Sequence, residues 1–64
     1  MYVNGQPYRY RDGLTLHALL HELEVDQRKT VVMHGDDVFR AGTVPDVPIA
    51  ESDVIEIVQM MQGG

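Results

Sequence analysis

The chain has no cysteine, and this absence alone removes several classes of function. It excludes disulfide bonds, zinc sites built on thiolates and a thiol nucleophile. No apolar run approaches the length needed to cross a bilayer, so we expect no membrane association. The first residues, Tyr2-Val3-Asn4-Gly5, lack the basic and apolar stretches of a signal peptide. These features together predict a cytoplasmic protein.

Positive charge is scarce as well. Five Lys and Arg residues stand against ten Asp and Glu residues, which gives a net charge of −5. A nucleic-acid-binding protein needs cations to displace the counterions of the phosphates. The longest basic run is Arg28-Lys29, so we expect no binding to nucleic acid.

The first segment of the chain has the pattern of a β-hairpin. Met1–Val3 is a short strand-like stretch, and Asn4-Gly5 follows it directly. Both turn residues tolerate positive φ, which makes this pair a strong hairpin signal. Pro7–Tyr10 is then the expected return strand, with proline confined to an edge or to the start of the strand.

A helix is predicted next, with Thr15 as its N-cap. Four leucines then follow the i, i+3, i+4, i+7 spacing of one buried helical stripe. They are Leu16, Leu19, Leu20 and Leu23. We expect the helix to end near Val25 and Asp26, and its leucines to supply most of a small core.

Three strands are predicted after the helix. Thr30–His34 contains three consecutive apolar residues, Val31 to Met33, which is typical of an inner strand covered on both faces. Val38-Phe39 is a short fourth strand, Ile49 is expected in the core, and Val54–Met61 is the last strand.

This order predicts an α+β domain of one helix across a mixed sheet of about four to five strands. If the first and last strands pair, they run parallel in the middle of the sheet. The domain then spans residues 1–60, and residues 61–64 leave it as an extended, flexible tail.

The tail ends on Gly63-Gly64, and its carboxylate suits group transfer. Glycine has no Cβ to hinder the acyl carbon, and it lets the backbone pass through a narrow channel. From Met61 to Gly64 the extended chain reaches roughly 13 Å, which suffices to enter another protein's active site. An ATP-using partner could convert the carboxylate to an acyl-adenylate, and a sulfur donor could then form a thiocarboxylate. The alternative is an exposed terminus without function.

The sequence resembles the ThiS-type sulfur carriers, which are small ubiquitin-like proteins of thiamin biosynthesis. The resemblance covers nearly the whole chain and rests on four motifs. These are VNGQP at 3–7, LTLHALLHEL at 14–23, VP at 44–45 and SDVIEIVQMMQGG at 52–64. It implies a β-grasp fold, adenylation and thiolation of Gly64, and threading of Met61, Gln62 and Gly63 into the partner.

The resemblance also implies the partners. They are a ThiF-type adenylyltransferase that uses ATP with Mg²⁺, a sulfur donor such as a cysteine desulfurase system, and thiazole synthase. The chain itself would bind no cofactor, catalyse no reaction and be a monomer when free. The alternatives are a sulfur carrier for molybdopterin or cysteine synthesis, a ubiquitin-like protein modifier, and a passive β-grasp binding module.

The last strand also predicts a docking face. Alternation puts Val54, Glu56, Val58 and Met60 on one side. If Glu56 faces water, the apolar residues beside it are partly exposed, as at many partner surfaces. The alternative is that a flanking loop covers them.

The chain has three histidines, and we expect none of them to bind a metal ion. His17 and His21 lie four residues apart, but no third ligand stands at a recognisable spacing, so a solvated helix flank is favoured. His34 stands alone and is expected to be structural. Members of the family often have glycine where Ser52 stands, which would strain Ser52 if this turn needs positive φ.

Overall fold

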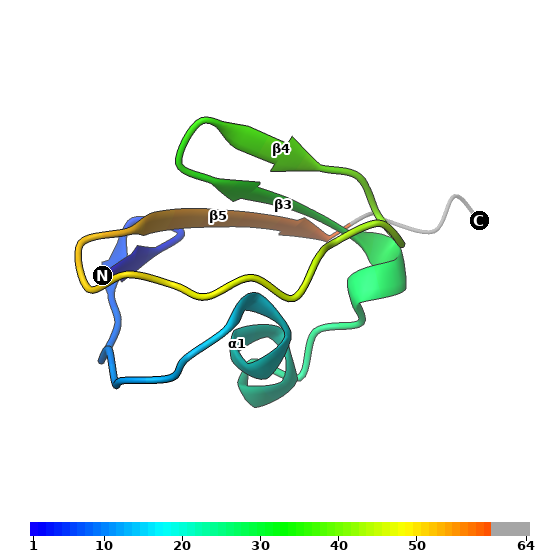
Figure 1. Ribbon diagram of the computed structural model, residues 1–64. Coiled ribbons are helices and arrows are strands. Elements are labelled where there is room, and N and C mark those ends of the chain that lie inside the picture. The colour runs from blue at the N-terminus through cyan, green and yellow to red at the C-terminus, as the bar shows by residue number, and fades with distance from the viewer. Residues whose placement is uncertain (60–64) are drawn as a thin grey trace.

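The computed structural model describes residues 1–59, which form a five-stranded mixed sheet with one α-helix against it (Figure 1). The sheet order is β2-β1-β5-β3-β4. Along the chain the elements are β1 (Tyr2–Val3), β2 (Gln6–Pro7), α1 (Leu16–Glu22), the 3₁₀ helix η1 (Gln27–Lys29), β3 (Thr30–His34), β4 (Asp37–Phe39) and β5 (Val54–Gln59). This is the β-grasp arrangement that the sequence predicts.

The N-terminal hairpin turns at the predicted residues but is shorter than predicted. Asn4 and Gly5 have φ of 53° and 80°, the positive values that a tight two-residue turn requires. The return strand is Gln6–Pro7 and not Pro7–Tyr10. The chain leaves the sheet at Tyr8, whose N–H makes a last hydrogen bond to the carbonyl of Met1 at 3.0 Å.

Helix α1 begins as predicted and ends earlier. The Thr15 hydroxyl accepts a hydrogen bond from the N–H of Ala18 at 3.3 Å, as an N-cap does. Glu24 then takes a left-handed conformation with φ of 57°. The Glu24 and Val25 N–H groups turn back to the carbonyls of His21 and Leu20, which closes a Schellman motif. The helix therefore ends at Glu22, before Val25 and Asp26.

The core lies between α1 and the sheet. Leu16, Leu19 and Leu20 are at most 2% exposed, whereas Leu23 at the end of the stripe is only partly buried. The other buried apolar residues come from the strands and the loops: Val3, Leu14, Val32, Val44, Ile49, Ile55 and Ile57. The prediction that Ile49 enters the core is confirmed.

Strand β5 lies in the middle of the sheet. It pairs in parallel with β1, where Tyr2 faces Val54, and antiparallel with β3, where Thr30 faces Gln59. The predicted parallel pairing of the first and last strands is therefore confirmed. β5 runs between two neighbours and finishes at the end of the molecule away from the N-terminus (Figure 1).

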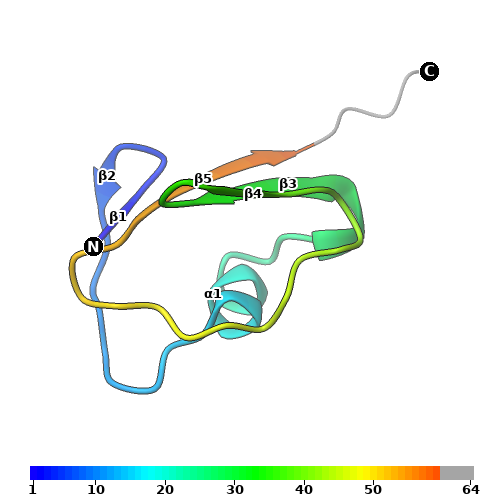
Figure 2. The same cartoon turned by 45° about the horizontal axis from the view of Figure 1, so that its top comes forward.

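Residues 1–59 cover only one face of the sheet. Figure 2 shows α1 and the segment from 40 to 53 on one side, and none of the described chain lies over the other side. The prediction that Val31 and Met33 are covered on both faces is therefore wrong. Both are half-buried, while Val32 between them is fully buried. A strand can be central in its sheet and still have one open face.

The backbone at Ser52 tests one further local expectation. Among residues 1–59, Asn4 and Glu24 are the non-glycine residues with positive φ, so Ser52 carries no strain of this kind. No helix in the described part of the chain is long and apolar enough to cross a membrane.

Candidate functional site: the outer face of the sheet

The side chains of β5 alternate between the core and the uncovered face. Ile55 and Ile57 point inward and are 0% and 8% exposed. Val54 and Val58 point outward and are 51% and 49% exposed, and Glu56 between them is exposed too. The alternation predicted for this strand is confirmed from Val54 to Val58, whereas Gln59, predicted on the side of Ile55 and Ile57, is exposed. No loop within residues 1–59 covers the outward side chains.

Neighbouring strands extend this apolar surface. Val54 lies opposite Tyr2 on β1, and Val58 lies opposite Val31 on β3. Met33 of β3 stands between Glu56 on one side and Val38 of β4 on the other. Directly opposite residues share a face of the sheet. We therefore define the outer face as Tyr2, Val31, Met33, Val38, Val54, Glu56 and Val58.

The outer face contains the large apolar side chains that are clearly exposed within residues 1–59. Within residues 1–59, the large apolar residues that are clearly exposed are Tyr2, Val38, Val54 and Val58, and all four belong to it. Single exposed apolar residues are normal, whereas exposed apolar groups are often found where partners bind. Val58, Val54 and Glu56 were predicted here from the sequence, and Tyr2 and Val38 were missed.

A side chain holds the far half of β5 in place. β1 turns away after Val3, so beyond Ile55 the ladder on that side has no further strand residue. The Asn4 carboxamide oxygen accepts a hydrogen bond from the N–H of Ile57 at 2.6 Å instead. Asn4 thus makes the turn and also replaces a ladder bond, which supports this side of β5 as far as Ile57.

The start of β5 is held by a carboxylate. Asp53 accepts hydrogen bonds from the Ala50 N–H at 2.8 Å and from His34 Nε2 at 2.6 Å. These contacts, with the backbone N–H first, lower the pKa of the Asp53 carboxyl below its ordinary value of 3.8. His34 is only 17% exposed in its side chain and has the structural role expected for it.

The two helix histidines have different surroundings. His17 Nε2 donates to the Val44 carbonyl at 2.7 Å, which occupies one ring nitrogen. His21 is exposed, as a solvated flank predicts. Within residues 1–59, no three His, Asp or Glu side chains are grouped so that they could hold a metal ion.

The predicted tail residues lie outside the described part of the chain. They are Met60, Met61, Gln62, Gly63 and Gly64. Sulfur attachment at Gly64, threading by the residues before it and docking by Met60 therefore stay predictions. What the structure describes is the strand that leads to them.

Comparison with known proteins shows to which family this chain belongs. Residues 1–64 match the ThiS family over their whole length. The chain is 38% identical over 64 residues to the sulfur carrier protein ThiS of Thermus thermophilus, covering 100% of this chain and 98% of that protein. It is also 32% identical over 62 residues to a thiazole synthase of Paramagnetospirillum magneticum, covering 97% of this chain but 19% of that protein.

Proposed function

Because this chain belongs to the ThiS family, we propose that it carries sulfur for thiazole formation in thiamin biosynthesis, as a thiocarboxylate on Gly64. The observation that carries the proposal is the match to a sulfur carrier along nearly the full length of both chains. In this role the chain is a substrate of its partner enzymes and not a catalyst.

The proposed chemistry takes place in two steps on one acyl carbon. A carboxylate oxygen of Gly64 attacks the α-phosphorus of ATP, and pyrophosphate leaves. The resulting acyl-adenylate has a far better leaving group than the carboxylate. The outer sulfur of a persulfide on the donor then attacks the acyl carbon, and AMP leaves with the former carboxylate oxygen. A thiol reductant cleaves the S–S bond of the resulting acyl disulfide and is itself oxidised to a disulfide, which leaves the thiocarboxylate on Gly64 and a thiol on the donor. ATP and Mg²⁺ belong to the activating partner, a ThiF-type adenylyltransferase.

The thiazole synthase relative supports the choice of acceptor. In that protein, the part similar to this chain makes up about a fifth of the length. A carrier-like segment joined to a thiazole synthase fits a reaction in which the two must meet. We therefore propose thiazole synthase as the acceptor and a cysteine desulfurase system as the class of sulfur donor.

The outer face is the surface that we propose for docking on these partners. It presents Val54 and Val58 beside Glu56, on the strand that leads directly to the tail. A contact there fixes the position of the end of β5. The number of tail residues then limits how far the reacting carbon can lie from this strand.

Intact mass spectrometry tests the proposal. We incubate the chain with the adenylyltransferase of the same organism, ATP, Mg²⁺, a persulfide sulfur donor and a thiol reductant, and expect one oxygen atom to be replaced by sulfur. Deletion of Gly64 and addition of one residue after it are matched controls that leave residues 1–59 unchanged. One residue shifts the end by about 3.3 Å, while a misplacement of 1 Å can cost about 100-fold in rate.

Both variants should stay unmodified. Thiolation of either variant at the parent's rate would refute the role of Gly64. A covalent adduct with another protein's lysine, in place of a thiocarboxylate, would instead identify a protein modifier.

A further inference from the structure

The few cations of this acidic chain are not spread evenly over it. Three of the five Lys and Arg residues are close together, and all three are exposed. Arg28 and Lys29 belong to η1, and Arg40 follows β4. The turn after Arg40 is joined to η1 because the Gly42 N–H donates to the Gln27 carbonyl at 3.0 Å. We call Arg28, Lys29 and Arg40 the basic pole.

The basic pole lies at the end of the molecule where β5 finishes. Thr30, the residue after η1, pairs with Gln59, the last residue of β5. Figure 1 shows η1 and the end of β5 together, opposite the N-terminus. The cations therefore lie at the end of the sheet where β5 finishes, on the side of β3 and β4.

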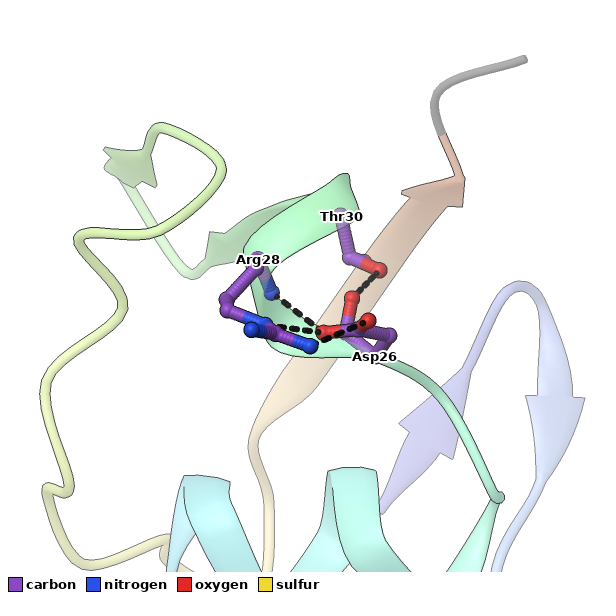
Figure 3. A network of polar contacts seen from close by, with 3 residues as sticks. All are labelled: Asp26, Arg28 and Thr30. Carbon is purple, nitrogen blue, oxygen red and sulfur yellow. Dashed lines mark hydrogen bonds and ion pairs between the residues drawn. The ribbon is translucent and has the colours of Figure 1, made fainter. Parts of the chain in front are cut away.

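Hydrogen bonds fix η1 in this position (Figure 3). The Asp26 carboxylate accepts from the Arg28 N–H at 2.9 Å, and the Thr30 hydroxyl donates to the Asp26 carbonyl at 2.7 Å. The guanidinium of Arg28 also reaches the Asp26 carboxylate at 3.3 Å and 3.4 Å. Within residues 1–59, Lys29 and Arg40 form no ion pair, so their charges face the solvent.

The rest of the molecule has the opposite sign. At the end of β5, these three cations stand against two acidic residues. The two are Glu24, which lines a groove together with Gln59, and Asp26, which pairs with Arg28. The other eight acidic residues stand against only two cations. Four of these acids lie at the far end, around the turn between β3 and β4 and before β5: Asp36, Asp37, Glu51 and Asp53. The carrier is thus positive at one end and negative over the remainder.

From this separation we infer that the basic pole docks on an acidic rim of the activating enzyme, around the cleft that receives the tail. The inference rests on the proposed function, since it assumes that Gly64 enters such a cleft. An acidic rim attracts the basic pole, which lies at the end of the carrier that must face the cleft. It repels the acidic remainder of the carrier. The charge distribution would therefore select the productive orientation before contact.

The length of the tail indicates whether the basic pole acts on side chains of the enzyme or on the phosphates of ATP. Residues 60–64 separate the basic pole from the reacting carboxylate by about 16 Å when extended. The Debye length at physiological ionic strength is about 8 Å, so charges at this distance are largely screened from the phosphates of ATP. The cations must act on side chains at the cleft entrance.

Charge reversal at single positions tests the inference. We compare Lys29→Glu and Arg40→Glu with Arg9→Glu, which makes the same change in net charge at an exposed residue of the other end. The position of Arg9 follows from its neighbour Tyr8, whose N–H bonds to Met1. Association with the adenylyltransferase is followed by stopped flow, and thiolation rates by mass spectrometry.

At low salt we expect each variant of the basic pole to associate about tenfold more slowly than the parent, within the range of electrostatic steering. Arg9→Glu should change the rate less than about twofold, since rates in one complex respond mainly at contacting charges. At about 1 M salt, where the Debye length is about 3 Å, the rates should converge. The rate of thiolation at saturating carrier and the KM for ATP should stay unchanged.

Three results would overturn the inference while the proposed function stands. They are equal effects of Lys29→Glu and Arg9→Glu, slower association that persists undiminished at about 1 M salt, and an altered KM for ATP. The second would indicate local packing, and the third would place the cations on the nucleotide. If the parent itself is never thiolated, the proposed function fails, and this inference fails with it.

Discussion

Replacing Val58 by aspartate separates docking from stability, because this side chain is only partly buried. Val58 is 49% exposed and lies opposite Val31. Full burial of a valine is worth about 1.5–3 kcal/mol, so half of that, about 1 kcal/mol, is lost. The lower strand preference of aspartate adds up to about 1 kcal/mol. We expect Val58→Asp to destabilise the fold by about 1–2 kcal/mol.

This loss leaves the protein folded. A chain of 64 residues has a free energy of unfolding of about 3–10 kcal/mol. Each kcal/mol shifts the Tm of a domain of this size by about 4–8 °C, so the expected decrease is about 4–16 °C. Circular dichroism gives the Tm and shows whether the variant is folded at the temperature of the binding assay.

Binding should suffer much more than stability. In the proposed complex, the new carboxylate would be buried against an apolar partner surface without a counterion. The loss of about 2 kcal/mol that defines a binding hot spot corresponds to about 30-fold in Kd. Calorimetric titration with the adenylyltransferase should therefore show affinity reduced by at least about 30-fold.

Two control variants make the outcome decisive. Ile57→Val, one residue away on the buried face, should cost about 0.5–1.5 kcal/mol in stability and leave affinity unchanged. Ser52→Asp adds the same charge at an exposed turn away from the end of β5. If Val58→Asp binds like the parent, or if Ile57→Val weakens binding as much, then the outer face is not the docking surface.

Three further predictions concern the fold. Leu20→Ala removes a side chain that is 2% exposed, so we expect a loss of about 2–5 kcal/mol by denaturant unfolding; a loss of a few tenths would contradict its place in the core. Glu24→Gly should stabilise by about 0.5–1 kcal/mol, because a left-handed φ of 57° strains glutamate and suits glycine; a lower Tm would contradict this. Asp53→Asn should destabilise at neutral pH. The lowered pKa of Asp53 means that its stabilisation is present above its ordinary pKa of 3.8 and is lost as the pH falls through the lower folded value. The variant's acid unfolding profile should therefore be flatter below about pH 4, and an unchanged profile would count against this role.

Most of the fold was predictable because local signals agreed with one another. Asn4-Gly5 can hardly form anything but a tight turn, and Thr15 followed by a leucine stripe describes one helix. The alternation from Val54 to Val58 gave the inner and outer faces of β5 directly. In each case, the conformation depends on residues close in the sequence.

Features that depend on distant residues were not predictable in the same way. Three apolar residues in a row, Val31 to Met33, indicate a buried strand, but which face is covered depends on where α1 lies. Tyr2 and Val38 belong to the outer face only because β1 and β4 pair into the same sheet. The grouping of Arg40 with η1 likewise needs the contact between Gly42 and Gln27.

The early end of α1 has a different cause. Glutamate is a good helix former, so Glu24 gives no signal of a stop. The chain nevertheless turns there, because Val25 packs against the core and Asp26 then caps η1 ahead of β3. A tertiary requirement overrides the preference of one residue, at a cost in strain that Glu24→Gly should relieve.

The parallel pairing of β1 and β5 determines how the protein responds to mechanical force. When the start of β1 is held and the end of β5 is pulled, the load runs along both strands in opposite senses. The hydrogen bonds between them, with the Asn4 contact to Ile57, are then sheared together and do not open one after another. An edge strand pulled sideways would unzip at much lower force. We therefore expect the resistance of the domain to a pull on the end of β5 to depend on this ladder more than on the modest thermodynamic stability of the small domain.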